Sequence, residues 1–174
     1  MKGTGKFLLA IAVGVMILVT ALLISALLHF QPDQYRAEDT PEGVVHNYLL
    51  ALELKDYERA YTYLLASLSG RPATVEQFAA DIDELIANID HPPYNVNWYK
   101  DDVSLTVESA RVKDDWASVS VRGARAQAGT LFEDGNSSYI FYVSARREDG
   151  TWKIEFAEWY WSYCWNDPAD PGCR

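Results

Sequence analysis

The chain has 174 residues, enough for one domain and a short additional segment. Residues 1–30 contain two lysines and no carboxylate, whereas residues 31–174 contain 13 basic and 25 acidic residues and carry a net charge of −12. An acidic surface of this kind repels phosphate, so we expect no nucleic-acid partner. Anionic lipid repels it too, so the acidic part is expected to stand off the bilayer.

The stretch from residue 7 to residue 30 contains no charged side chain. As a helix, its 24 residues would be about 36 Å long, which spans a hydrocarbon core of about 30 Å with some tilt. The alternative is a cleaved signal peptide, whose apolar region is usually about 7–15 residues long and precedes a small-x-small cleavage site. The longer run and the lack of a clean site favour an uncleaved transmembrane signal-anchor.

Flanking charge predicts the orientation of this anchor. Lys2 and Lys6 precede the apolar stretch, and acidic residues follow it. Positive flanks stay in the cytoplasm, so the N-terminus is expected inside and residues 31–174 outside the cytoplasmic membrane. The expected organisation is a cytoplasmic tip at 1–6, a single transmembrane span at 7–30, a linker at 31–39 and an extracytoplasmic domain at 40–174.

The first helix after the linker is predicted to start at Thr40-Pro41-Glu42. These residues supply a capping hydroxyl, a proline at the first helical position and an acid in the first turn. Apolar residues at helical spacing extend this helix to about residue 55. His46 and Asn47 fall off the apolar stripe, and His46 is expected in solvent.

Two more helices follow in the sequence. Asp56 is placed to cap the second helix, and residues 69–72 are expected to stop it. Thr74 with Gln77 three residues later resembles a capping box and predicts a third helix to about residue 89. Its acidic side is interpreted as a solvated face, because the carboxylates lack the oxygen-rich loop that calcium requires.

After residues 91–95 the apolar period changes to two, which predicts strands. The expected strands cover about 103–112, 116–122, 138–145 and 151–163, with a bulge near Ser109 and a two-residue turn at Asp149-Gly150. Helices followed by hairpin-connected strands indicate an α+β fold, in which three helices pack on one face of a four-stranded antiparallel sheet.

Residues 44–64 carry a resemblance to a known family. A helix ends in a short polar turn and is followed by Asp56, Tyr57, Ala60 and Tyr61. This pattern, together with the order of elements over about residues 40–163, resembles the nuclear transport factor 2-like superfamily, which includes ketosteroid-isomerase-like proteins. The resemblance implies a strongly curved sheet wrapped around the helices into a cone. Members include isomerases, carriers and non-catalytic scaffolds, several of them tethered outside the bacterial membrane by one N-terminal helix, so the resemblance does not fix an activity.

A ketosteroid-isomerase-like site would need a carboxylate base inside the cone and hydroxyl donors facing it. In the expected last strand Glu158 shares a face with aromatic residues, which makes it a weak catalytic candidate with a raised pKa. The alternative places Glu158 at the end of the sheet, solvated or paired with an arginine. The residues expected to line a pocket are Tyr61, Phe78, Tyr139, Phe156, Glu158 and Tyr160.

No metal site or cofactor is expected. The three histidines are widely spread, and the chain has no glycine-rich phosphate loop or dinucleotide motif. Cys164 and Cys173, with eight residues between them, are predicted to form a disulfide that holds the C-terminal tail against the sheet. Two free thiols are the alternative, and they would contradict an extracytoplasmic location.

The aromatic cluster near the C-terminus suggests an interface. Trp159 and Trp161 alternate with the predicted pocket residues, so with Trp116 they are expected on the outer face of the sheet. A homodimer through this face is the leading prediction and a membrane-protein partner the second; alternatively, the tryptophans only cover the sheet and tail. The sequence therefore predicts a membrane-tethered, non-catalytic interaction domain, with small-molecule binding or isomerase-like catalysis as the alternative.

Overall fold

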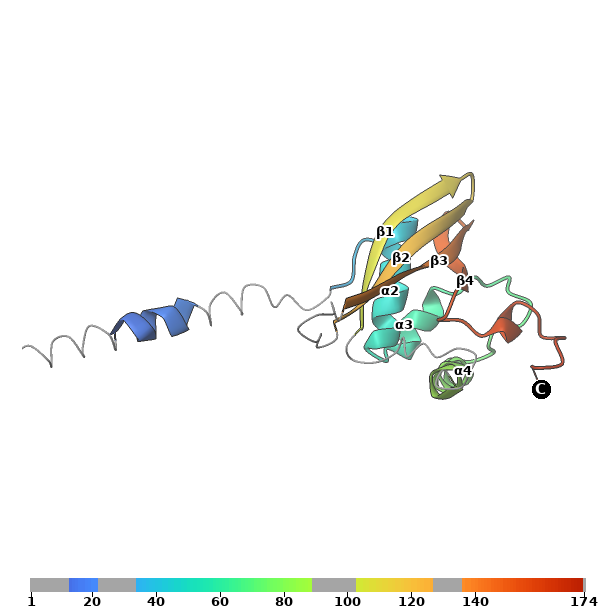
Figure 1. The fold of residues 1–174 in the computed structure, drawn as a ribbon. Helices are drawn as coiled ribbons and strands as arrows, with labels where there is room; N and C mark the ends of the chain where they lie inside the picture. Colours follow the sequence, from blue (N-terminus) through green and yellow to red (C-terminus); the bar gives the residue numbers. More distant parts are fainter. Residues whose placement is uncertain (1–12, 22–33, 89–102, 127–135, 174) are drawn as a thin grey trace, which may run out of the picture. The chain divides into compact units, whose positions relative to one another are not determined.

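The computed structural model describes residues 13–21, 34–88, 103–126 and 136–173 (Figure 1). The chain divides into two compact units, Met1–Gln34 and Tyr35–Arg174. In the first unit residues 13–21 are helical, and the rest of the predicted anchor at 7–30 lies outside the described residues. No helix in the described parts of the chain is both long and apolar enough to cross a membrane.

The second unit begins with three helices, and the predicted helix starts are confirmed. The side chain of Thr40 accepts a hydrogen bond from the Gly43 amide at 3.1 Å, and Asp56 accepts one from the Arg59 amide at 3.2 Å. Each cap satisfies an amide that has no partner within its helix. The helices are α2 (Pro41–Glu53), α3 (Tyr57–Thr62) and α4 (Val75–Asn88).

Four antiparallel strands follow in the order β1-β2-β3-β4, so the predicted α+β class is confirmed. The register shifts between Val107 and Ser109, which confirms the predicted bulge in the first strand. Asp149 and Gly150 have φ values of 50° and 81°, as a two-residue hairpin turn requires. The strands are β1 (Val103–Lys113), β2 (Trp116–Ala126), β3 (Asn136–Glu148) and β4 (Thr151–Ala157).

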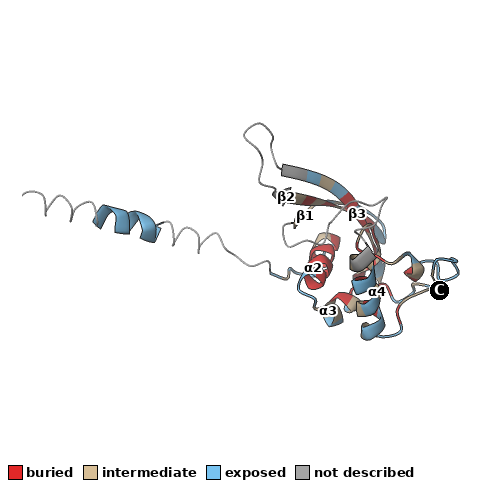
Figure 2. Ribbon diagram, turned by 60° about the horizontal axis from the view of Figure 1, so that its bottom comes forward, coloured by how far each residue is buried: buried red, intermediate tan, exposed pale blue. Residues whose placement is uncertain are grey.

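The core lies between α2 and one face of the sheet, and α2 is buried along most of its length (Figure 2). His46 and Asn47 are only 8% and 0% exposed, so the expectation that His46 lies in solvent is wrong. The reason is that α2 is covered both by the sheet and by the segment that precedes it. A Cβ at Gly43 would lie 2.0 Å from the Ala37 carbonyl oxygen, which shows how closely that segment approaches the helix.

The segment after α3 covers the free edge of β4. The Ile154 amide donates to the Tyr63 carbonyl at 2.7 Å, and the Leu65 amide donates to the Ile154 carbonyl at 2.9 Å. These bonds occupy the edge at Ile154, so this position of the strand cannot pair with another chain. The same segment then leads into residues 69–72, which form part of the site described below.

The last strand is shorter than predicted, and this changes the position of Glu158. The register of β3 and β4 shifts between Ser144 and Ala145, and the strand ends at Ala157. An extra residue in one strand moves every later side chain to the other face. Trp159 then takes a left-handed backbone conformation with φ 71°, so the alternation expected through residue 163 is wrong.

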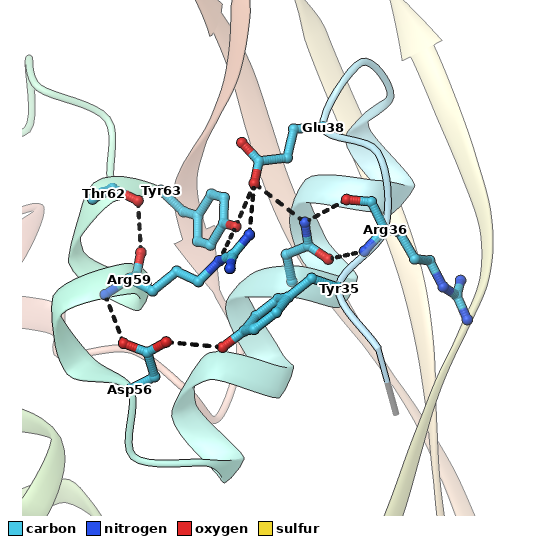
Figure 3. Close-up of polar contacts among 8 residues, drawn as sticks. Tyr35, Arg36, Glu38, Asp56, Arg59, Thr62 and Tyr63 are labelled. Atoms are coloured by element: carbon cyan, nitrogen blue, oxygen red, sulfur yellow. Dashed lines mark hydrogen bonds and ion pairs between the residues drawn. The ribbon is translucent and has the colours of Figure 1, made fainter. Parts of the chain in front are cut away.

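Residues 35–38 form a strap that is held against α2 and α3 by side chains (Figure 3). The Asn47 carboxamide bonds both backbone groups of Arg36: its oxygen accepts from the amide at 2.7 Å, and its nitrogen donates to the carbonyl at 2.9 Å. Glu38 accepts from the Tyr63 hydroxyl at 2.7 Å and from the Arg59 guanidinium at 3.3 Å. The strap therefore belongs to the folded unit.

Arg59 and Asp56 hold the start of the strap. The guanidinium carbon of Arg59 lies 3.5 Å from the centre of the Tyr35 ring, and the Tyr35 hydroxyl donates to Asp56 at 3.1 Å. A cation over an aromatic face is attracted by the ring quadrupole. The strap is thus fixed to the helices of the second unit from its first residue onward.

Replacing Asn47 with alanine removes both bonds to Arg36 and leaves part-buried backbone groups without partners. We expect the free energy of unfolding of the full chain to fall by about 2 kcal/mol in urea titrations, and the Arg36 amide to exchange faster with solvent. Thr106→Ala, on the exposed face of β1, is the control and should change stability by less than about 0.5 kcal/mol. Equal free energies of unfolding for the two variants would contradict the claim that Asn47 holds the strap.

Candidate functional site

An open cleft of about 770 Å³ lies between α4 and the C-terminal segment. Figure 1 shows α4 (green) and this segment (red) at the same end of the second unit. The volume falls within the range of about 300–1,000 Å³ that is usual for ligand sites. The cleft is lined by Gly70, Arg71, Gln77, Asp81, Glu84, Leu85, Trp161, Ser162, Tyr163, Cys164, Trp165, Pro168, Asp170, Gly172 and Cys173.

Two buried tryptophans form the base of the cleft. Trp165 is 1% exposed and Trp161 is 2% exposed, and their ring centres are 4.8 Å apart in an edge-to-face arrangement. Trp165 also packs 5.2 Å from the Phe78 ring of α4, and its indole nitrogen donates to Asp81 at 2.7 Å. The C-terminal segment is therefore anchored in the core by an indole that has both apolar and polar partners.

One side of α4 forms the first wall. Gln77, Asp81, Glu84 and Leu85 follow the i, i+4, i+7, i+8 spacing that places side chains on one helix face. Asp81 is engaged by Trp165, whereas Glu84 is exposed and makes no hydrogen bond or ion pair with a described residue. The acidic side of this helix, interpreted from sequence as a solvated face, is in part the wall of a cleft.

The second wall is the loop closed by the Cys164–Cys173 disulfide, and the predicted pairing is present in the structure. Inside the loop the Asp170 carboxylate accepts from the Gly172 amide at 2.7 Å, and the Cys173 amide donates to the Asp170 carbonyl at 3.0 Å. These local bonds define the shape of a short polar loop. The disulfide fixes the loop beside the 3-10 turn at Tyr163–Trp165.

Gly70 lies where the loop after α3 meets the C-terminal segment. Its amide donates to the Trp165 carbonyl at 2.9 Å, and the Ser69 hydroxyl donates to the Asn166 carbonyl at 2.6 Å. A Cβ at Gly70 would lie 2.0 Å from the Cys164 carbonyl oxygen, so only glycine fits this approach. The loop after α3 and the C-terminal segment are consequently joined backbone to backbone.

The cleft carries a net negative charge. Among the described residues, its charged lining consists of three carboxylates and one guanidinium, which together give a net charge of −2. The Arg71 guanidinium lies over the Tyr61 ring at 4.1 Å and donates to the Tyr61 hydroxyl at 2.8 Å. Its enclosed Nε atom has no hydrogen-bond partner among the described residues. No group of three or more potential ligands in the described chain is arranged to hold a metal ion.

The residues predicted to line a pocket in the cone do not line this cleft. Phe78 and Tyr160 are buried, and Phe156 is half-buried. Tyr139 lies across Gly123, where a Cβ would be 2.0 Å from its ring, and its ring centre is 5.9 Å from that of Phe141. Aromatic side chains thus occupy the space between helices and sheet.

Glu158 is placed where the second sequence interpretation put it, at the end of the sheet. Its carboxylate accepts a hydrogen bond from the Tyr142 amide at 3.2 Å, and its own amide donates to the Tyr142 carbonyl at 3.1 Å. The side chain therefore extends the pairing of β3 past the end of β4. Tyr142 is 56% exposed, so the Glu158 carboxylate is bonded at an exposed part of the sheet.

The three tryptophans proposed as an interface do not lie together on the outer face. Trp116 is 40% exposed, Trp159 is partly buried against the core, and Trp161 is buried. The expected exposure of Trp161 is wrong because the chain leaves the sheet at Ala157 and turns inward. The Tyr48 hydroxyl holds this turn by donating to the Tyr160 carbonyl at 2.9 Å. The alternative interpretation from sequence, in which the tryptophans only cover the sheet and tail, fits Trp161.

Comparisons with known proteins give only distant similarity. No family model and no curated protein matches the chain. The solution structure of a SEC-C motif-containing protein from Rhodopseudomonas palustris is similar with a TM-score of 0.43 and 17% identity, covering 70% of this chain and 79% of that one. An NTF-2-like protein of unknown function from Shewanella oneidensis MR-1 gives a TM-score of 0.36 and 11% identity, covering 64% and 88%. Similarity at this level assigns neither a family nor a function.

Replacing both Cys164 and Cys173 with serine should lower the free energy of unfolding by about 2–3 kcal/mol, because the unfolded chain gains loop freedom. Backbone amides of residues 166–173 should exchange faster, whereas the tryptophan emission maximum should stay unchanged because Trp165 is held by Phe78 and Asp81. A red-shifted emission in the folded double variant would mean that the disulfide, rather than the indole, holds the segment.

Tyr57 provides a test of how α3 meets α4. Burial, and then its hydrogen bond to Asp83 at 2.6 Å, raise the pKa of Tyr57 from 10.0 to about 12. A raised folded-state pKa gives stability that is complete below about pH 10 and is lost as the pH rises through about 12. The tyrosinate absorbance titration should lose a contribution near pH 12 when Tyr57 is replaced, in Tyr57→Phe. A titration at the ordinary value would contradict this contact.

Proposed function

We propose that the chain is a membrane-tethered, extracytoplasmic interaction domain without catalytic activity, which binds a protein partner in the cleft between α4 and the C-terminal loop. The observation that carries this proposal is the construction of the cleft. A helix face forms one wall, a disulfide-closed loop forms the other, and two buried indoles form the base. A site whose walls are fixed before binding loses little conformational entropy on association.

The tether is supported by sequence and by the strap. Residues 7–30 are apolar and uncharged, and the strap at 35–38 begins only five residues later. Asn47, Glu38 and Arg59 attach this strap to the helices, so the folded unit would begin within a few residues of the end of the span. The disulfide is consistent with an oxidising compartment outside the cytoplasm.

Membership of the nuclear transport factor 2-like superfamily is part of this proposal. Its support is the polar turn with Asp56 and the following aromatic residues, together with the order of helices and antiparallel strands. Small-molecule binding inside a cone has less support, because Phe78, Ile82 and Phe141 are each 0% exposed and fill that space. Glu158, the catalytic candidate, faces no such space.

A photo-crosslinking amino acid placed at Leu85 or Ser162, both of which line the cleft, tests the proposed surface in the full chain in native membranes. We expect both positions to give an adduct of the same mass and Thr106, on the outer sheet face, to give none. Adducts at Thr106 with none at the cleft positions, in protein that is folded, would contradict the cleft as the partner site.

Self-association through the outer face of the sheet is the second candidate. Trp116, Ile140 and Tyr142 lie on β2 and β3 and are 40%, 47% and 56% exposed. Exposed apolar side chains on neighbouring strands are typical of contact surfaces. Sedimentation of the full chain in neutral detergent should then show a dimer that Trp116→Ala weakens; a monomer at all concentrations would remove this candidate.

A further inference from the structure

We propose that the cleft receives a lysine or arginine side chain from an extended basic segment of the partner. This inference rests on the function proposed above and specifies the chemistry of the partner. It is carried by the charge and the aromatic surface of the cleft. Carboxylates lie on both walls, with Asp81 and Glu84 on α4 and Asp170 on the disulfide loop.

The carboxylates are available to different degrees. Glu84 is exposed and has no partner among the described residues, whereas Asp81 and Asp170 each accept one hydrogen bond from the protein. A carboxylate has two oxygens and about four acceptor positions, so both engaged groups can accept further bonds from a ligand. Acceptors on opposite walls suit a group with several N–H donors, such as an ammonium or a guanidinium.

Tyr163 adds an exposed aromatic face to the lining of the cleft. Its side chain is 73% exposed although it follows the buried Trp161 and precedes the buried Trp165. A large aromatic side chain held in solvent at the edge of an acidic cleft can attract a cation through its ring face. Among the described residues, the one ring contact of Tyr163 is a tilted contact with Phe156 at 6.2 Å, so most of the ring face stays open to a ligand.

Other ligand classes fit the cleft less well. An anion would meet three carboxylates, and Arg71, the one basic residue among the described lining residues, lies over the Tyr61 ring and donates to its hydroxyl. The described carboxylates do not converge as metal ligands do. A small free cation would use little of an open cleft of about 770 Å³. A chain segment fills such a cleft while its basic side chain meets the carboxylates.

The test measures binding of a fluorescently labelled, end-blocked tetralysine peptide to the full chain in neutral detergent. We expect saturable binding that weakens with added salt, and no binding of a tetraglutamate peptide. Glu84→Gln should weaken the affinity about threefold and Glu84→Lys about tenfold. Glu58→Gln removes an equal charge from an exposed position on α3, outside the cleft, and should change the affinity by less than about twofold.

Tyr163 gives a second, independent comparison. Tyr163→Phe keeps the aromatic face and should bind like the unaltered chain, whereas Tyr163→Leu should weaken binding about threefold. Spermine, a free polyamine, should bind at least about tenfold more weakly than the peptide, because it cannot fill the cleft. Equal affinities for spermine and the peptide would overturn the assignment to a protein segment.

The outcomes separate this inference from the function on which it rests. If the peptide does not bind, or if Glu58→Gln weakens binding as much as Glu84→Gln does, the proposal that the cleft receives a basic segment is wrong. Crosslinks from Leu85 and Ser162 in membranes would then still support the cleft as a partner site. Loss of both the crosslinks and the peptide binding would overturn both proposals.

Discussion

The burial of Trp165 is the interaction on which the rest of this end of the molecule depends. The indole lies between Phe78 of α4 and Trp161, and its nitrogen donates to Asp81 at 2.7 Å. A buried aromatic side chain of this size contributes several kcal/mol, about 3–5 when it is truncated to alanine. In the described structure α4 adjoins α3, and it meets the C-terminal segment through this ring. Without Trp165, both α4 and the chain after β4 would lose a principal contact with the core.

The cleft follows from this arrangement. Its lining comes from three separate stretches of sequence, at residues 70–71, 77–85 and 161–173, which Trp165 and Gly70 bring together. The disulfide then limits the motion of the loop that forms the outer wall. Stability and the candidate site are therefore linked. The buried apolar contacts of Trp165 support the segments whose carboxylates and Tyr163 line the cleft. At the opposite terminus of the unit, the strap uses the same principle, since buried Asn47 fixes a segment that has little apolar surface of its own.

Much of the fold was predictable because local chemistry determined it. Thr40 and Asp56 cap helices, Asp149-Gly150 makes a turn, and the bulge between Val107 and Ser109 shifts the apolar phase within a single strand. The site was not predictable, because it depends on long-range contacts. The irregular register of β4 moved Glu158 away from an aromatic face, and the turn after Ala157 carried Trp161 inward. The spacing of Gln77, Asp81 and Glu84 was visible as an acidic helix face, but only the position of the C-terminal loop makes that face a wall.

Hydrogen exchange of the Trp165 indole N–H, followed by nuclear magnetic resonance on the full chain, tests the central claim most directly. The indole nitrogen is bonded to Asp81 and its ring is 1% exposed, so we expect exchange only through opening of the folded unit, at a rate similar to that of core amides in β2 and β3. The Trp165 signal is identified by its absence from the spectrum of the Trp165→Phe variant. Exchange at the rate of an exposed indole in otherwise folded protein would show that the C-terminal segment is not anchored, and neither the cleft nor its proposed ligand would stand.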